Sequence, residues 1–364
     1  MYQQLLKPIL FQMDPEKAHH LTVDGMATAA EIPGFLPLLK SMYGVQRNPA
    51  LELTLCGLNF PSPIGLAAGL DKNGVAVKGF AAIGFGFMEV GTVTPLPQSG
   101  NEQPRLFRLP EDEALINRMG FNNVGTEAMK SNLRRNGRVP IPVAVNIGKN
   151  KVTPNEEAEE DYRKCVRALY QEGDFFVINI SSPNTPGLRN LQHGEELRSL
   201  LAAVKQEMAQ QAVKIGGADK PVFVKIAPDL STEELEYIME TIVNSGVSGV
   251  IATNTTLDRE GLNHPNRTEA GGLSGRPLTE KSTEVIRRIY AQTGGRLPII
   301  GVGGIFTAED AYAKIRAGAS LIEVYTALIY SGPGLVREIQ NGLAAKLKQD
   351  GFTHITQAIG ADHR

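Results

Sequence analysis

Polar side chains stand at the ends of several short apolar runs, and their types indicate a binding site for a flat polar ring. Asn146, Asn179 and Asn254 end or follow three such runs. A buried amide without partners costs roughly 1–3 kcal/mol. Three converging amides are therefore better explained by a polar heterocyclic ligand than by packing. Lys72 and Lys225 occupy similar positions and would place positive charge beside that ligand.

Lys225 has two chemical interpretations. An amine whose pKa is lowered can form a Schiff base with a carbonyl substrate. An amine that stays charged can instead lie beside an electron-accepting ring and stabilise its reduced anion. The surrounding segment, Lys225-Ile-Ala-Pro228, does not distinguish between them.

A glycine-rich segment near the end of the chain is typical of a phosphate site. It reads Gly301-Val-Gly303-Gly304-Ile305, and Tyr325-Thr326 ends a later apolar run. Glycines lack the Cβ atoms that would keep an anion away from backbone N–H groups. A plain tight turn is the alternative. A polar ring that carries a phosphate suggests a phosphorylated cofactor such as FMN.

The segment from Asn179 to Gly187 contains a candidate base. Pro183 and Pro186 stiffen it, and Ser182 lies at its centre. A serine here is either a base or a turn former. No histidine other than His193 lies near it in the sequence, so a Ser-His-Asp triad is not indicated. A serine hydroxyl is a weak base, which works only where water is excluded and a proton relay exists.

The elements that position these residues alternate between apolar runs and helical patterns. Eight strands are predicted at 63–68, 86–91, 141–147, 175–180, 222–226, 249–253, 298–302 and 320–325. Eight strands, each followed by a helix, predict an α/β fold of the (β/α)8 TIM barrel type, whose active site lies at the carboxyl ends of the strands. An open doubly wound sheet is the alternative. Its glycine fingerprint is incomplete here, because Phe306 stands where the third glycine belongs.

The first 45 residues have a different pattern and predict a small helical extension, followed by a barrel over 46–364. One helix is predicted from Asp14-Pro15 to about Ala30, and a second over 36–43. Leu5, Leu6 and Ile9 belong to an apolar cluster that precedes them. The extension is either a hairpin packed on the barrel or an apolar lip for a lipid-like partner.

Composition excludes several classes of function. The 364 residues carry 37 Lys and Arg against 39 Asp and Glu, so no basic excess indicates nucleic acid binding. Two distant cysteines, Cys56 and Cys165, indicate no disulfide framework and fit a reducing compartment. Neither a signal peptide nor a membrane-spanning run is expected, which predicts a cytoplasmic protein that can still touch a membrane. No metal site is expected, because the adjacent His19 and His20 face different sides of a helix.

Five motifs resemble those of the dihydroorotate dehydrogenases. They are Ala68-Gly-Leu-Asp-Lys-Asn-Gly, Asn117-Arg-Met-Gly-Phe121-Asn, Asn179-Ile-Ser-Ser-Pro-Asn-Thr, Gly271-Gly-Leu-Ser-Gly-Arg-Pro and Gly301-Val-Gly-Gly-Ile. The helical extension and a serine at the base position resemble the class 2, quinone-dependent branch. The resemblance implies oxidation of (S)-dihydroorotate to orotate, with hydride transfer to FMN and reoxidation by a membrane quinone. It also implies a peripheral protein on the cytoplasmic face of the inner membrane, whose N-terminal helices meet the membrane surface.

The resemblance also assigns residues. Ser182 matches the catalytic base, which takes the C5 proton while the flavin accepts the C6 hydride. The flavin positions are Ala68, Gly69, Leu70, Asp71, Lys72, Thr92, Asn146, Asn179, Lys225, Thr253, Gly275, Gly304, Tyr325 and Thr326. The substrate positions are Lys72, Asn117, Arg118, Met119, Gly120, Phe121, Asn179, Asn184, Asn254 and Thr255. The quinone tunnel would involve His19, Arg108 and Tyr325. Removal of residues 1–40 is then expected to spare flavin reduction and to impair quinone turnover.

Overall fold

Eight parallel strands close into a barrel in the computed structural model, which describes residues 2–364. The strands are β3 (Ile64–Leu66), β4 (Phe87–Val93), β7 (Val143–Ile147), β8 (Phe175–Asn179), β9 (Val222–Ile226), β10 (Gly249–Ala252), β12 (Ile299–Val302) and β13 (Leu321–Val324). They follow one another around the barrel in chain order, and β13 pairs with β3 to close it. The predicted TIM barrel is thereby confirmed, and the open sheet is excluded.

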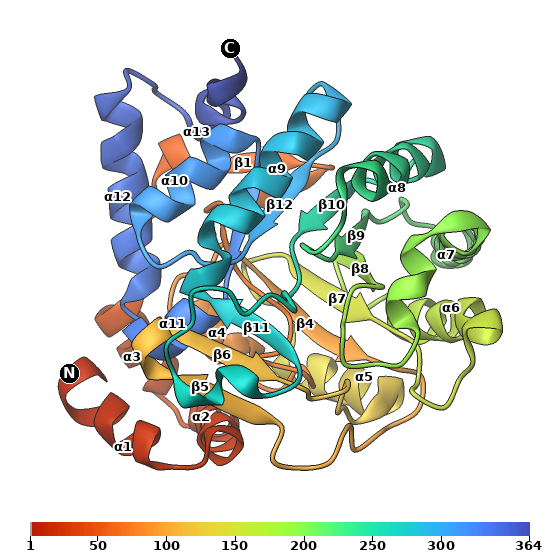
Figure 1. Cartoon of the computed structure of the whole chain (residues 1–364). Coiled ribbons are helices and arrows are strands. Elements are labelled where there is room, and N and C mark those ends of the chain that lie inside the picture. The colour runs from red at the N-terminus through yellow and green to blue at the C-terminus, as the bar shows by residue number, and fades with distance from the viewer. Residues whose placement is uncertain (1) are drawn as a thin grey trace.

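Helices surround this barrel (Figure 1). They are α4 (Val77–Ala82), α5 (Gly125–Asn136), α6 (Ala158–Leu169), α7 (Gly194–Ile215), α8 (Thr232–Ser245), α9 (Thr279–Thr293), α10 (Ala308–Ala317), α11 (Thr326–Ser331), α12 (Leu335–Gln349) and α13 (Ile355–Ala358). Local sequence explains where several begin. Ser231 and Thr307 form capping boxes at the starts of α8 and α10, each reciprocated by an acidic residue three positions on.

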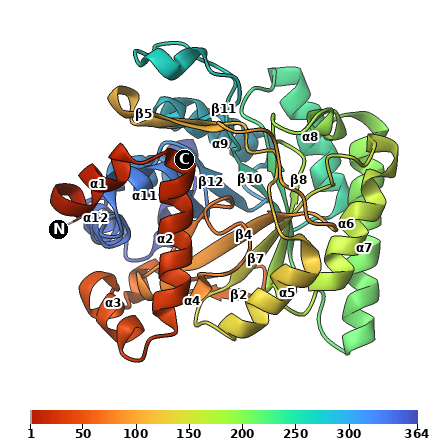
Figure 2. The ribbon, with the colours of Figure 1, turned by 90° about the horizontal axis from the view of Figure 1, so that it is seen from below.

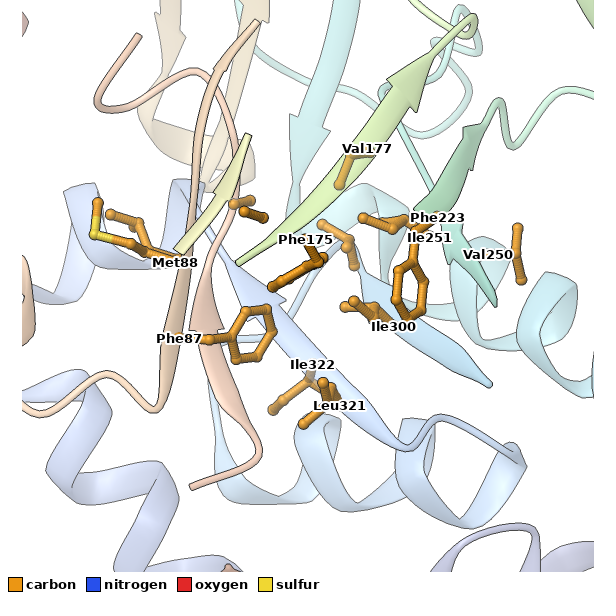
Figure 3. Packing of buried hydrophobic residues seen from close by; sticks show 14 of the residues in the cluster. Phe87, Met88, Phe175, Val177, Phe223, Val250, Ile251, Ile300, Leu321 and Ile322 are labelled. Atoms are coloured by element: carbon orange, nitrogen blue, oxygen red, sulfur yellow. The ribbon is translucent and has the colours of Figure 1, made fainter. Parts of the chain in front are cut away.

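Aromatic side chains fill the amino-terminal end of the barrel. Phe87, Phe175 and Phe223 point into the interior from three strands (Figure 3). Phe60, from the hairpin of β1 (Leu53–Leu55) and β2 (Leu58–Phe60), packs beneath them with its ring centroid 5.4 Å from that of Phe87. Since side chains alternate along a strand, the interior residues two positions further on form the next layer. On β4 and β9 these residues are Glu89 and Lys225, which belong to the floor of the site, whereas on β8 Val177 comes first and the polar Asn179 follows it, level with Lys225.

A small antiparallel sheet covers the opposite end of the barrel. It consists of β5 (Leu106–Leu109), β6 (Ala114–Asn117) and β11 (Gly272–Gly275), in the order β11-β6-β5. Two insertions supply it, one between β4 and α5 and one between β10 and α9. Figure 2 shows this sheet crossing one end of the molecule. The sequence does not predict it, because its strands are short and β11 pairs with β6 across more than 150 residues.

The N-terminal extension runs along the side of the barrel from the end that the small sheet covers (Figure 2). It comprises a π-helical turn (Tyr2–Leu6), α1 (Lys7–Gln12), α2 (Pro15–Ala30) and α3 (Phe35–Tyr43). Both predicted helices are confirmed, and Asp14 caps α2 by accepting the N–H groups of Glu16 and Lys17. Neither these helices nor any other in residues 2–364 combine the length and the hydropathy needed to cross a bilayer.

Candidate active site

One cavity lies between the carboxyl ends of the barrel strands and the small sheet, and most of the predicted site residues line it. They are Ala68, Gly69, Lys72, Thr92, Asn117, Met119, Gly120, Phe121, Asn179, Ser182, Asn184, Lys225, Thr253, Asn254, Thr255, Gly275, Gly304, Tyr325 and Thr326, with His19 from α2. Residues separated by about 300 positions in the chain thus surround a single space. This is the location that the barrel fold predicts for an active site.

The predicted amides are present as a connected network. Asn179 donates from Nδ2 to the hydroxyl of Thr92 at 2.9 Å and to Oδ1 of Asn146 at 3.1 Å. Asn254 donates to the hydroxyl of Ser181 at 2.9 Å. Asn146 is fully buried and lies outside the cavity wall, where it accepts from Thr92 and Asn179 and donates to Glu89. The network therefore fixes the orientation of Asn179 and Asn254 before any ligand arrives.

Three ionisable side chains form the floor of the cavity. Nζ of Lys225 lies 2.6 Å from Oε2 of Glu89 and 3.7 Å from Oε2 of Glu323, and all three side chains are almost completely buried. Burial opposes the charge of Lys225, but the two carboxyl groups outweigh it, so its pKa lies above the ordinary value. Burial also opposes the charge of Glu89, but Lys225 lowers the pKa of Glu89 below its ordinary range.

Sequence reasoning missed both carboxyl groups. A signal was present, because each interrupts an apolar strand, in Phe87-Met-Glu-Val and in Leu321-Ile-Glu-Val. A charged residue in the middle of a buried strand is rare unless it is paired. The close ion pair with Glu89 and the raised pKa of Lys225 favour the fixed cation over the Schiff-base amine, which requires a lowered pKa.

A second cation lies nearer the opening. Lys72 follows Gly69, whose φ of +100° turns the chain at the end of β3, and donates to the Gly69 carbonyl at 2.7 Å. Burial lowers the pKa of Lys72 to about 8. His19 lines the same cavity from α2, and burial together with the charge of Lys72 lowers its pKa well below the ordinary value.

Glycines form the end of the cavity below the small sheet. Gly304 has φ +67°, and a Cβ placed there would lie 2.4 Å from the backbone nitrogen of Thr279. Gly275 has φ +110°, and a Cβ there would lie 2.4 Å from the Glu113 carbonyl oxygen. Only glycine therefore fits at these two positions. Buried Lys314 stands behind them and donates to the Ser282 hydroxyl, which in turn donates to the Gly303 carbonyl.

Ser182 is buried in the wall of the cavity, with 7% of its surface exposed. Its oxygen accepts the backbone N–H of Asn184 at 3.3 Å, and no side chain in residues 2–364 bonds to it. Asn184 in turn donates to Oδ1 of Asn117 at 3.2 Å. Thr255 also lines the cavity, and its buried hydroxyl has no partner within the described chain. The Ser182 and Thr255 hydroxyls are thus available to a ligand.

Five predicted site residues lie outside the cavity wall. They are Leu70, Asp71, Arg108, Arg118 and Asn146. Asp71 shapes the Lys72 loop by accepting the N–H groups of Val75 and Ala76. Arg118 pairs with Glu269 at 2.6 Å.

Arg108 bonds to the N-terminal segment and does not line the cavity. It donates to the carbonyl of Met13 at 2.8 Å and to that of Leu10 at 3.1 Å.

Comparisons with known proteins agree with this geometry. The sequence model of the family described as dihydroorotate dehydrogenase matches residues 50–347. A protein named dihydroorotate dehydrogenase (quinone) from Deinococcus deserti is 55% identical to this chain, and the match covers 100% of both proteins. A protein of the same name from Deinococcus radiodurans is 57% identical, and the match covers 99% of this chain and 100% of the relative. A crystal structure of DHODH from Eimeria tenella in complex with ferulenol superposes with a TM-score of 0.88 at 43% identity, covering 96% of both chains.

Proposed function

Because the chain belongs to the dihydroorotate dehydrogenase family, in its quinone-dependent class 2 branch, we propose that its cavity oxidises (S)-dihydroorotate to orotate with FMN as hydride acceptor. Members of this family carry out this oxidation in pyrimidine biosynthesis. One observation supports the proposal most: the glycine end, the charged floor, the amide network and Ser182 all border a single cavity.

The residues present fit FMN. Gly275 and Gly304 line the cavity with backbone that carries no side chain and could bind a phosphate, and the Thr326 hydroxyl lines the same cavity, bonded to Ser274. Thr92 and Asn179 present polar atoms to the edge of a ring. Lys225 supplies a positive charge beneath it. When bound, FMN accepts the hydride from C6 of the substrate.

Ser182 would remove the proton from C5. A hydroxyl is a weak base in water, and its burial in the cavity wall satisfies the requirement that water be excluded. Lys72 would pair with the substrate carboxylate, and Asn117, Asn184 and Asn254 would orient its ring. Asn184 donates to Asn117, and Asn254 donates to the Ser181 hydroxyl. These hydrogen bonds hold the amides in place before substrate binds, which lowers the entropy cost of positioning.

The N-terminal helices would bring the quinone and the membrane surface to the site. Leu5, Ile9, Leu21 and Leu38 expose 57–62% of their surfaces on this extension, an unusual density of exposed apolar side chains. His19 of α2 reaches the cavity wall, where Tyr325 also lies. We therefore assign the quinone entrance to this side. We place the protein peripherally on the cytoplasmic face of the inner membrane.

An anaerobic absorbance experiment tests the proposal. Purified protein should contain FMN, and dihydroorotate should bleach the flavin in the absence of oxygen. Among quinone, fumarate and NAD, quinone should restore the colour fastest. A colourless protein, or a flavin that dihydroorotate leaves oxidised, would contradict the proposal. Borohydride in the presence of a carbonyl substrate should leave Lys225 unlabelled.

A further inference from the structure

The floor of the cavity contains more negative groups than it can neutralise. One amine, Lys225, stands between two carboxyl groups, Glu89 and Glu323, and the three come from β9, β4 and β13. If all three were ionised, the floor would carry a net charge of −1 away from water. An uncompensated buried carboxylate costs several kcal/mol, and such groups gain a proton instead.

The hydrogen bonds show which carboxyl group is ionised. Glu89 accepts from Nζ of Lys225 and Nδ2 of Asn146, both at 2.6 Å, and from the backbone N–H of Ala68 at 2.9 Å. Three donors on one carboxylate stabilise its charge. Within residues 2–364 neither oxygen of Glu323 has a hydrogen-bond partner, and its distance of 3.7 Å from Nζ of Lys225 is too long for a hydrogen bond.

The surroundings of Glu323 offer no other compensation. The neighbouring strands β12 and β3 contain only Ile, Leu, Val and Gly. Across the barrel, the charged groups that face Glu323 are Glu89, which repels its charge, and Lys225, which attracts it. Burial and the charge of Glu89 together raise the pKa of Glu323 well above its ordinary value.

We propose that Glu323 is a protonated carboxylic acid at neutral pH and acts as a positioning residue, which leaves Lys225 balanced by Glu89 alone. The floor then has no net charge. This inference rests on the proposed function for its consequence, because the floor lies beneath the ring that gains negative charge on reduction. An ionised Glu323 would oppose that gain, since Coulomb interactions are strong where water is excluded. By staying uncharged, Glu323 avoids lowering the reduction potential of the ring.

Infrared spectroscopy of the protein at neutral pH tests the proton directly. The wild type should show the carbonyl stretch of a buried protonated carboxyl group, and E323Q should lack it. In E89Q the band should also disappear, because Glu323 becomes the sole partner of Lys225 and ionises. Two results would overturn the proposal. In one, the wild type shows no such band that E323Q removes; in the other, the band is still present in E89Q. If E323Q does not fold, E323D should shift the band, because the protonated group itself is changed. A band that E323D leaves in place and E89D shifts would put the proton on Glu89 and overturn the proposal.

The midpoint potential of the bound flavin gives a second readout. E323Q and E89Q should each match the wild type at neutral pH, because both leave Lys225 with one negative partner. The double variant should show a marked upward shift, because Lys225 is then unbalanced. An upward shift of similar size in each single variant would mean that both carboxyl groups are ionised and would overturn the proposal.

Thermal unfolding at different pH values gives a third readout. Because folding raises the pKa of Glu323, its contribution to stability is complete below the ordinary carboxyl pKa of 4.5 and is lost as pH rises above that value. The melting temperature of E323Q minus that of the wild type should therefore increase as pH rises above about 4.5. A constant margin would contradict the proposal. If dihydroorotate fails to bleach the flavin while the infrared result holds, only the proposed function fails.

Discussion

The mouth of the barrel and the N-terminal extension are built in different ways. In the barrel mouth, buried polar groups bond to one another, as the network of Thr92, Asn146 and Asn179 shows, and the site has its shape before a ligand binds. The extension buries Val23 and Leu39 against the barrel but leaves apolar side chains such as Ile9 and Leu38 exposed. The preformed barrel mouth suits chemistry that needs fixed geometry. The exposed apolar side chains of the extension suit a surface that is buried in a lipid bilayer.

The two regions nevertheless share one buried ion pair. Glu16 of α2 lies 2.7 Å from Arg105, and both side chains are less than 10% exposed. Arg105 also donates to the carbonyls of Ser99 and Asn101, both at 2.6 Å. Asn101 donates to the carbonyl of Asn184, a residue of the cavity wall. The extension therefore supports the loop that holds the substrate side of the site. This contact revises the expectation that its removal would spare flavin reduction.

The largest expected effect is on the rate of flavin reduction, and the same substitution should leave flavin binding unchanged. Ser182→Ala should slow flavin reduction by dihydroorotate by about 10²–10⁴-fold, the usual contribution of a positioned base. Flavin content and visible spectrum should stay as in the wild type, since the hydroxyl bonds only to a backbone N–H. Anaerobic stopped-flow absorbance measures the rate. Near-normal reduction in this variant would remove Ser182 from the mechanism.

The next effect tests whether the extension is structurally coupled to the barrel. Glu16→Ala leaves the Arg105 guanidinium buried without its carboxylate, which typically costs about 3–5 kcal/mol. We expect a lower melting temperature and a weaker affinity for orotate. As a control, Asp24→Ala on the exposed face of the same helix should change neither quantity. Equal behaviour of the two variants would show that the regions are independent.

A smaller effect concerns pH. Lys72 loses its charge as pH rises through about 8, so orotate affinity should fall above that pH, by at most about tenfold per pH unit. Below that pH the amine is charged and the affinity should be constant. Calorimetric titration at several pH values measures this. Lys72→Arg keeps its charge and should show no such fall. A fall of the same size in both proteins would assign the titration to another group.

The smallest effect probes the exposed apolar face. Leu38→Gln should change the stability by less than about 0.5 kcal/mol, since the side chain is 57% exposed. Binding to lipid vesicles should weaken about fivefold, from roughly 1 kcal/mol for half-burying a leucine. Val213→Gln on α7 is the matched control, because Val213 is 83% exposed on a helix outside the extension. Equal vesicle binding by the two variants would show that this face does not meet the membrane.

Short-range patterns predicted much of this molecule. The strands at 222–226 and 249–253 are runs of β-branched and apolar residues, and Ser231 and Thr307 begin helices by local capping, so each is visible within a few residues. The contacts that sequence reasoning missed join distant segments. Glu89 meets Lys225 across 136 positions, Arg105 meets Glu16 across 89, and the small sheet joins two separate insertions. The spacing of residues along the chain does not encode which buried charges become partners.

A crystal structure with FMN and orotate bound tests the central claim most directly. The claim is that one cavity holds both the ring and the substrate. We expect the phosphate against Gly304 and Gly275, the ring above Lys225, and orotate between that ring and Ser182. Density for the flavin outside this cavity, or for orotate beyond reach of Ser182, would contradict it.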